Sequence, residues 1–201
     1  MEKLLFFDVD TQNDFMNQNG ALYVEGAEEI KPNLKQLIDC AKGCGIPVIA
    51  SIDAHSSDDP EFNEYPPHCI KGTRGQQKIE ETTIKRATVI QDNKNVPINP
   101  DSKFFVIEKT VFDMFSNKNT DTILESIKPD KCIVFGVATD ICVKKAVEAL
   151  LKRNYQVVLL EDAVRGINKD NTNRFFARAR NAGVEILSSY EVLKSLKCLS
   201  H

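Results

Sequence analysis

Short hydrophobic runs alternate with amphipathic stretches along the chain, and this alternation predicts the fold. Six runs are rich in Val, Ile and Phe and are almost continuously apolar, as strands covered on both faces are. These predicted strands span residues 4–9, 47–52, 104–107, 132–137, 156–160 and 184–187. The stretches between them with helical patterns span residues 27–43, 120–127, 140–153 and 169–182. Repeated strand–helix–strand order predicts an α/β fold with three layers, in which a mostly parallel six-stranded sheet has helices on both faces.

The domain organisation follows from the length and from one long irregular segment. A chain of 201 residues suits a single domain with a sizeable core, so we expect one domain over residues 1–201. Within it, residues 53–103 carry many prolines and glycines and few hydrophobic runs. A loop region of that length in a compact domain is usually functional, which makes residues 53–103 a candidate metal and substrate segment.

Composition and charge narrow the class of partner. The chain is 42% hydrophobic and 27% charged, with a net charge of −3 and basic residues spread along its length. This balance argues against a nucleic acid as the main partner. No apolar run is long enough to span a membrane, and charged residues begin at Glu2, so we expect neither a membrane contact nor a signal peptide. A cytoplasmic protein that binds a small molecule is the expectation, and homo-oligomers remain an option.

Polar residues at the ends of three predicted strands form the first candidate site. Asp10 follows the first strand, Lys109 follows the third, and Cys142 lies in the first turn of the helix predicted after the fourth. The carboxyl ends of parallel strands meet at one edge of a sheet, so we expect these three side chains to converge. A helix N-terminus lowers the pKa of a thiol, and its N–H groups can hold an oxyanion. The trio therefore predicts a cysteine nucleophile with a base and a cation beside it.

The small number of histidines indicates which kind of residue would act as the base for Cys142. Cysteine hydrolases often use a histidine, but this chain has only three: His55, His68 and His201. His201 is the terminal residue, and the other two belong to a second group of polar residues. We therefore expect the carboxylate of Asp10 to act as the base, with Lys109 helping to hold both groups charged.

The second group of polar residues follows the second predicted strand and indicates a metal site. Asp53 and His55 alternate onto one side of an extended segment, and His68 follows two consecutive prolines further along the loop. A carboxylate and two imidazoles suit one divalent ion such as zinc, iron or manganese, and zinc is our first choice. Several other side chains compete for a further ligand position: Asp58, Asp59, Glu61, Glu64 and Cys69.

Taken together, these segments resemble a known family. The start FDVDTQNDF, the strand end at Lys109 and the stretch GVATDICV are similar to the isochorismatase-like cysteine hydrolases. The segment DAH, followed by PPHCIKGTRG, resembles the nicotinamidase (pyrazinamidase) branch of that family, and EDAVRGIN fits its fifth strand and the following turn. The resemblance spans nearly the whole chain, and it implies an amidohydrolase that converts nicotinamide to nicotinate and ammonia.

The resemblance also implies roles for individual residues. The catalytic triad would be Asp10, Lys109 and Cys142, and a cis peptide before Ala138 would aim the N–H groups of Ala138 and Cys142 at the oxyanion. The resemblance further implies which residues bind the metal and which line the substrate pocket. The metal ligands would be Asp53, His55, His68 and, at a more variable fourth position, Glu61, and the substrate pocket would be lined by Phe15, Tyr65, Phe112 and Val137.

Under this resemblance the nucleophile forms a thioester with the substrate and the metal orients the pyridine ring. Three alternatives stay open at this point. The first is a relative without a functional metal that hydrolyses another amide or an ether. The second is a metallohydrolase in which the ion activates water and Cys142 takes no part. The third is a binding module with no catalytic activity.

Overall fold

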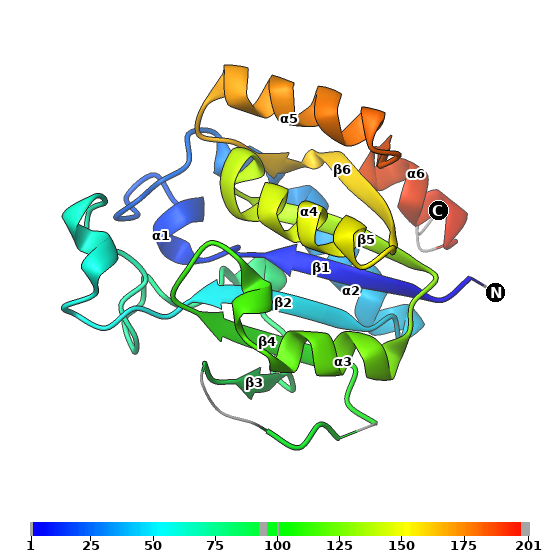
Figure 1. Cartoon of the computed structure of the whole chain (residues 1–201), viewed down its shortest axis with the longest axis horizontal. Helices are drawn as coiled ribbons and strands as arrows, with labels where there is room; N and C mark the ends of the chain where they lie inside the picture. The colour runs from blue at the N-terminus through cyan, green and yellow to red at the C-terminus, as the bar shows by residue number, and fades with distance from the viewer. Residues whose placement is uncertain (1, 93–95, 100, 198–201) are drawn as a thin grey trace.

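A computed structural model describes residues 2–92, 96–99 and 101–197, and a parallel β-sheet forms its centre (Figure 1). Among the described residues the sheet has seven strands, in the spatial order β3-β4-β2-β1-β5-β6-β7, and every neighbouring pair is parallel. The strands are β1 (Leu4–Val9), β2 (Val48–Asp53), β3 (Thr88–Ile90), β4 (Phe104–Lys109), β5 (Lys131–Val137), β6 (Gln156–Arg165) and β7 (Glu185–Leu187).

Helices cover both faces of this sheet. The α-helices are α1 (Asn13–Met16), α2 (Lys31–Cys44), α3 (Asn119–Ile127), α4 (Lys144–Lys152), α5 (Lys169–Asn181) and α6 (Ser189–Ser195). Side chains alternate along β1, so that Phe7 packs into one core layer with α3, α4 and α5, while Phe6 packs into the other with α2 and α6. Figure 1 shows α3 and α4 on one side of the strands and α2 on the other. The three-layer α/β architecture predicted from the hydrophobic pattern is therefore confirmed.

The predicted count of six strands is wrong, because β3 also joins the sheet. This strand has only three residues, and it pairs at the edge with β4 inside the segment that the sequence indicated as loop-rich. A three-residue strand is too short for an alternating pattern to be recognised. The helices α1 and α6 were not predicted either, because four and seven residues are too few to show a helical period clearly. Four residues of the loop-rich segment, 93–95 and 100, lie outside the described part of the chain.

The order of the strands determines where the functional loops lie. From β1 the chain adds β2 and β4 on one side of the sheet, and it later adds β5 on the other side. In parallel sheets such a reversal leaves a crevice at the carboxyl ends of the central strands. Within the described residues, none of the helices has the length and apolar character required to cross a membrane.

Gly136 allows β5 to approach β1 closely, just before the chain enters this crevice. Its φ angle is +115°, and a Cβ atom at this position would lie 2.0 Å from the carbonyl oxygen of Val9. Val9 and Gly136 are partners in the register of the two strands. A side chain at residue 136 would therefore force the two central strands apart.

Replacing Gly136 with Ala is expected to lower the free energy of unfolding by about 2–4 kcal/mol, because both the backbone conformation and the contact with β1 become strained. The measurement is equilibrium unfolding in urea. The matched control is Gly43→Ala, since Gly43 lies exposed in α2 and a Cβ atom added there would meet nothing within 4 Å apart from its chain neighbours and the backbone of its own helix. The control is expected to raise stability by roughly 0.5–1 kcal/mol, and equal effects of the two substitutions would contradict the argument.

Candidate active site and metal centre

Four neighbouring strands deliver the candidate catalytic residues to one edge of the sheet. Lys109 is the last residue of β4 and pairs in register with Asp53, the last residue of β2. Asp10 follows directly after β1. Cys142 lies in a π-helical turn, residues Thr139–Val143, which connects β5 to α4. The turn was not predicted, but it places the thiol at the N-terminal end of the following helix, as the sequence indicated.

Lys109 is the hub of this cluster. Its side chain is fully buried, and its Nζ atom lies 2.8 Å from Oδ2 of Asp10 and 3.9 Å from Sγ of Cys142. Nζ also donates a hydrogen bond to Oδ1 of Asp53. The structure thus brings together the three side chains that the sequence placed at the ends of separate strands, and it adds Asp53 to their contacts.

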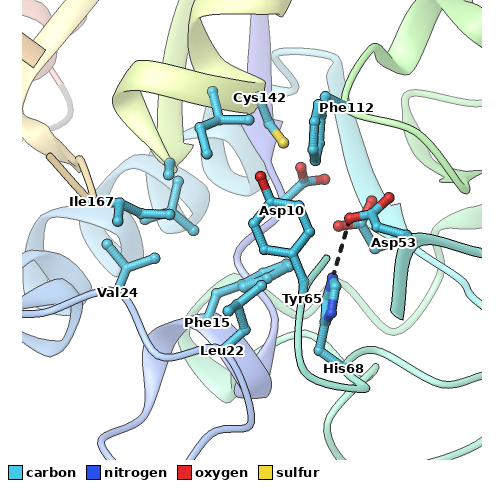
Figure 2. Close-up of a pocket in the computed structure, with 14 residues that line it drawn as sticks. Asp10, Phe15, Leu22, Val24, Asp53, Tyr65, His68, Phe112, Cys142 and Ile167 are labelled. Atoms are coloured by element: carbon cyan, nitrogen blue, oxygen red, sulfur yellow. Dashed lines mark ion pairs between the residues drawn. The ribbon is translucent and has the colours of Figure 1, made fainter. Parts of the chain in front are cut away.

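Asp10 is held by its own backbone and by a neighbour that the sequence reasoning missed. Its φ angle is +49°, in the left-handed region, and its N–H donates to the carbonyl oxygen of Ser51 at 3.2 Å. The hydroxyl of Ser51 donates to Oδ1 of Asp10 at 2.6 Å. A lone polar residue inside the apolar run of β2 was the available signal for Ser51. Figure 2 shows the carboxylate of Asp10 and the sulfur of Cys142 directed toward each other.

The buried position of the cluster changes the pKa of its members. Burial by itself would lower the pKa of Lys109, but the charges of Asp10 and Asp53 outweigh it and raise that pKa well above its usual value. Burial raises the pKa of the Cys142 thiol well above its usual value, although Lys109 opposes the shift. The expectation of a lowered thiol pKa is therefore wrong for the protein without bound ligands. Removal of water outweighs the positive charge of Lys109, so the thiol needs a base.

The side chains of Asp53, His55 and His68 form a second cluster beside the first. All three are buried, and one potential ligand atom from each lies within 4.8 Å of the others. The imidazole rings of His55 and His68 are 4.9 Å apart between centroids. Asp53 belongs to both clusters, since it also accepts the hydrogen bond from Lys109.

The donor set and its hydrogen bonds fit a divalent metal ion. Nε2 of His55 is buried without a hydrogen-bond partner among the described residues, which is costly unless a ligand occupies the position in front of it. In His68, Nδ1 is hydrogen-bonded to the carbonyl oxygen of Pro66 at 2.8 Å, which leaves Nε2 as the free donor of an electron pair. One carboxylate and two imidazole nitrogens suit zinc and other borderline ions.

Among the competing acidic residues, Glu61 lies next to the imidazoles. Its Oε1 is 3.8 Å from Nε2 of His68, and burial raises the pKa of its carboxyl group. Asp59 instead contacts Nδ1 of His55, the ring nitrogen opposite the unpartnered Nε2. Asp58 and Glu64 are exposed. Cys69 is buried, and burial raises its thiol pKa far above the usual value.

A pocket opens above the two clusters, with an empty volume of about 400 Å³ that includes solvent at its mouth (Figure 2). Its lining contains all four residues expected against the substrate, Phe15, Tyr65, Phe112 and Val137, together with Ala138 and Cys142. The peptide bond between Val137 and Ala138 is cis, as the resemblance implied. The lining also includes apolar residues that sequence reasoning missed, because single apolar residues in loops carry no pattern: Leu22, Val24, Ile141 and Ile167.

The relatives of this chain were found by comparison with known proteins. The chain is 28% identical to a nicotinamidase from Escherichia coli (strain K12), over 91% of this chain and 94% of that protein. A pyrazinamidase from Pyrococcus horikoshii, solved in complex with zinc, superposes with a TM-score of 0.77 at 26% identity, over 92% of this chain and 99% of that one. An N-carbamoylsarcosine amidase from Thermoplasma acidophilum superposes with a TM-score of 0.75 at 27% identity, over 93% and 96% of the two chains.

A family model also matches almost the whole chain. The model described as the isochorismatase domain matches residues 4–191, which include all the candidate catalytic and metal-binding side chains. The chain belongs to the isochorismatase domain family.

Proposed function

We propose that this protein is a nicotinamidase, an amidohydrolase that converts nicotinamide to nicotinate and ammonia. The observation that carries the proposal is the position of Lys109, whose ammonium group contacts Asp10 and Asp53 and lies 3.9 Å from the sulfur of Cys142. A nucleophile, a base and a metal-binding carboxylate therefore meet at one buried cation. The similarity to a nicotinamidase and to a zinc-bound pyrazinamidase supports the same reaction class.

In the proposed reaction Asp10 takes the proton of the Cys142 thiol, and the thiolate attacks the carboxamide carbon of the substrate. The N–H groups of Ala138 and Cys142 stabilise the oxyanion, and the loss of one such donor typically costs about 2.7–4 kcal/mol. Asp10 then gives its proton to the departing nitrogen, so that ammonia leaves and a thioester remains on Cys142. A water molecule deprotonated by Asp10 hydrolyses the thioester, which releases nicotinate and returns the proton to the thiolate.

Lys109 stabilises this sequence without reacting itself. Its fixed positive charge compensates the carboxylate of Asp10 in the resting enzyme and the thiolate of Cys142 after proton transfer. Asp53, His55, His68 and Glu61 would hold the divalent ion, with zinc as our first choice. When bound, the ion supplies a Lewis-acid position for a ring nitrogen of the substrate beside the nucleophile.

The charge of the pocket favours a neutral aromatic amide over an amide that carries a carboxylate. The lining contains three carboxylates, those of Asp10, Asp53 and Glu61, and neither lysine nor arginine. Most of the remaining lining is apolar, and Tyr65 and Phe112 pack edge to face with ring centroids 6.1 Å apart. A substrate such as N-carbamoylsarcosine would bring its own carboxylate into this largely apolar site, where the ammonium group of Lys109 is already paired with Asp10 and Asp53.

Replacing Cys142 with Ala is expected to reduce ammonia release from nicotinamide by at least about 10³-fold, because the step that forms the thioester is lost. Metal content is expected to stay unchanged, since Cys142 is not among the proposed ligands. Cys44→Ser, at an exposed cysteine of α2, is the matched control and should retain full activity. Substantial turnover by the Cys142→Ala protein would favour the metallohydrolase alternative.

Removing the metal with a chelator is expected to abolish nicotinamide hydrolysis, and adding back one equivalent of zinc, iron or manganese to restore it. The physical reason is that the ring loses the group that orients its amide toward Cys142. The measurement is ammonia release together with elemental analysis of the purified protein. Full activity in a protein that contains no metal would favour a metal-independent relative instead.

Substrate choice is expected to follow charge. With nicotinamide and N-carbamoylsarcosine compared under identical conditions, kcat/KM should be at least about 10²-fold higher for nicotinamide, because the anionic substrate buries an unpaired carboxylate. The comparison is made by ammonia release at several ionic strengths. A preference for N-carbamoylsarcosine would overturn the proposed substrate, and no hydrolysis of either compound would favour the binding-module alternative.

A further inference from the structure

The two candidate imidazole ligands are oriented by different kinds of group. Nδ1 of His68 is hydrogen-bonded to a backbone carbonyl oxygen, that of Pro66, at 2.8 Å. Nδ1 of His55 is hydrogen-bonded to a side chain instead, since Oδ2 of Asp59 lies 3.0 Å away. A carbonyl oxygen and an ionised carboxylate both accept hydrogen bonds and never donate them, so each partner requires a proton on Nδ1.

The consequence for His55 is that its other nitrogen is left with a free electron pair. Nε2 of His55 is fully buried, has no hydrogen-bond partner among the described residues, and belongs to the ring that lies beside Asp53 and His68. A neutral imidazole with its proton on Nδ1 is the form in which Nε2 binds a metal. The contact with Asp59 therefore prepares His55 for an ion.

Asp59 uses its two carboxylate oxygens for different tasks. While Oδ2 contacts His55, Oδ1 accepts a hydrogen bond at 3.0 Å from the backbone N–H of Glu61 and so caps the 3₁₀ helix Pro60–Asn63. The side chain is only 13% exposed. Asp59 thus contacts the ring of one candidate ligand and the backbone N–H of another, and it is not itself part of the group formed by Asp53, His55 and His68.

We propose that Asp59 is a positioning residue of the metal centre, which orients His55 and holds its proton on Nδ1 so that Nε2 binds the ion. The inference rests on the metal centre of the proposed function and not on the identity of the substrate. Outer partners of this kind typically change metal affinity by about 10–100-fold when they are removed. In the sequence analysis Asp59 was one of the residues that could bind the metal directly. In the structure it contacts the ligand His55 instead.

The test is the affinity of the metal-free protein for Zn²⁺, measured without substrate by competition with a chromophoric chelator. The variant is Asp59→Ser, because serine also caps helix N-termini but is too short to reach His55. We expect the dissociation constant for Zn²⁺ to rise by about 10–100-fold. The matched control is Asp58→Ser, which removes the same charge from the exposed neighbouring residue and should leave the affinity within about threefold of the original.

A double-mutant cycle separates an effect through His55 from one through Glu61. If Asp59 acted only by placing Glu61, then Asp59→Ser would add no further loss of Zn²⁺ affinity to a Glu61→Gln protein. We expect instead that most of the loss caused by Asp59→Ser persists in the Glu61→Gln background. Absence of an added loss would overturn the proposal.

The protonation of His55 gives a readout that does not depend on metal. In two-bond ¹H–¹⁵N spectra of the metal-free protein, we expect neutral His55 to carry its proton on Nδ1, and Asp59→Ser to produce a mixture of both tautomers. If Asp59→Ser does not fold, Asp59→Asn replaces it, because asparagine keeps the cap and loses the charge, and a loss of about tenfold in Zn²⁺ affinity is expected. Unchanged affinity and an unchanged His55 spectrum in the folded variant would overturn the proposal.

Discussion

The ammonium group of Lys109 is the interaction on which the whole site depends. A lysine without exposed surface is costly to bury, and it stays charged only where carboxylates compensate it. Here two carboxylates do so, those of Asp10 and Asp53, and each comes from a different strand end. The same contacts hold both acidic side chains in place. Removing the cation would leave two buried carboxylates facing each other, and neither the proposed base nor the candidate metal site would keep its arrangement.

Asp53 connects the two halves of the site. Through Lys109 it is linked to Asp10 and Cys142, and it also lies in the cluster with the two buried imidazoles. Burial raises the pKa of its carboxyl group, opposed first by Lys109. A nearby divalent cation would add a second positive charge and so favour the ionised form. The candidate nucleophile and the candidate metal position are thus coupled through one shared side chain.

The apolar wall of the pocket complements this charged floor. Aromatic and aliphatic side chains from several loops surround the thiol, while all the lining charges are negative. A mostly apolar pocket with a few fixed polar groups is typical of a binding site for a small molecule, which agrees with the proposed substrate. The segments that contribute this wall follow β1, β2, β4, β5 and β6, and the strand order brings them together without any long-range motif in the sequence.

The local sequence pattern was sufficient to predict the strands of the central sheet and the major helices. It also predicted that Asp10, Lys109 and Cys142 lie at strand ends. It was sufficient because hydrophobic periodicity and the geometry of parallel sheets are local rules that hold for any chain. The three-residue strand β3, the role of Ser51 behind Asp10, and the orientation of Asp59 toward His55 required the tertiary structure. Each depends on which atoms face one another in the folded chain, and spacing along the sequence carries no such information. The direction in which the thiol pKa shifts also required the tertiary structure, because burial of Cys142 raises this pKa more than the charge of Lys109 lowers it.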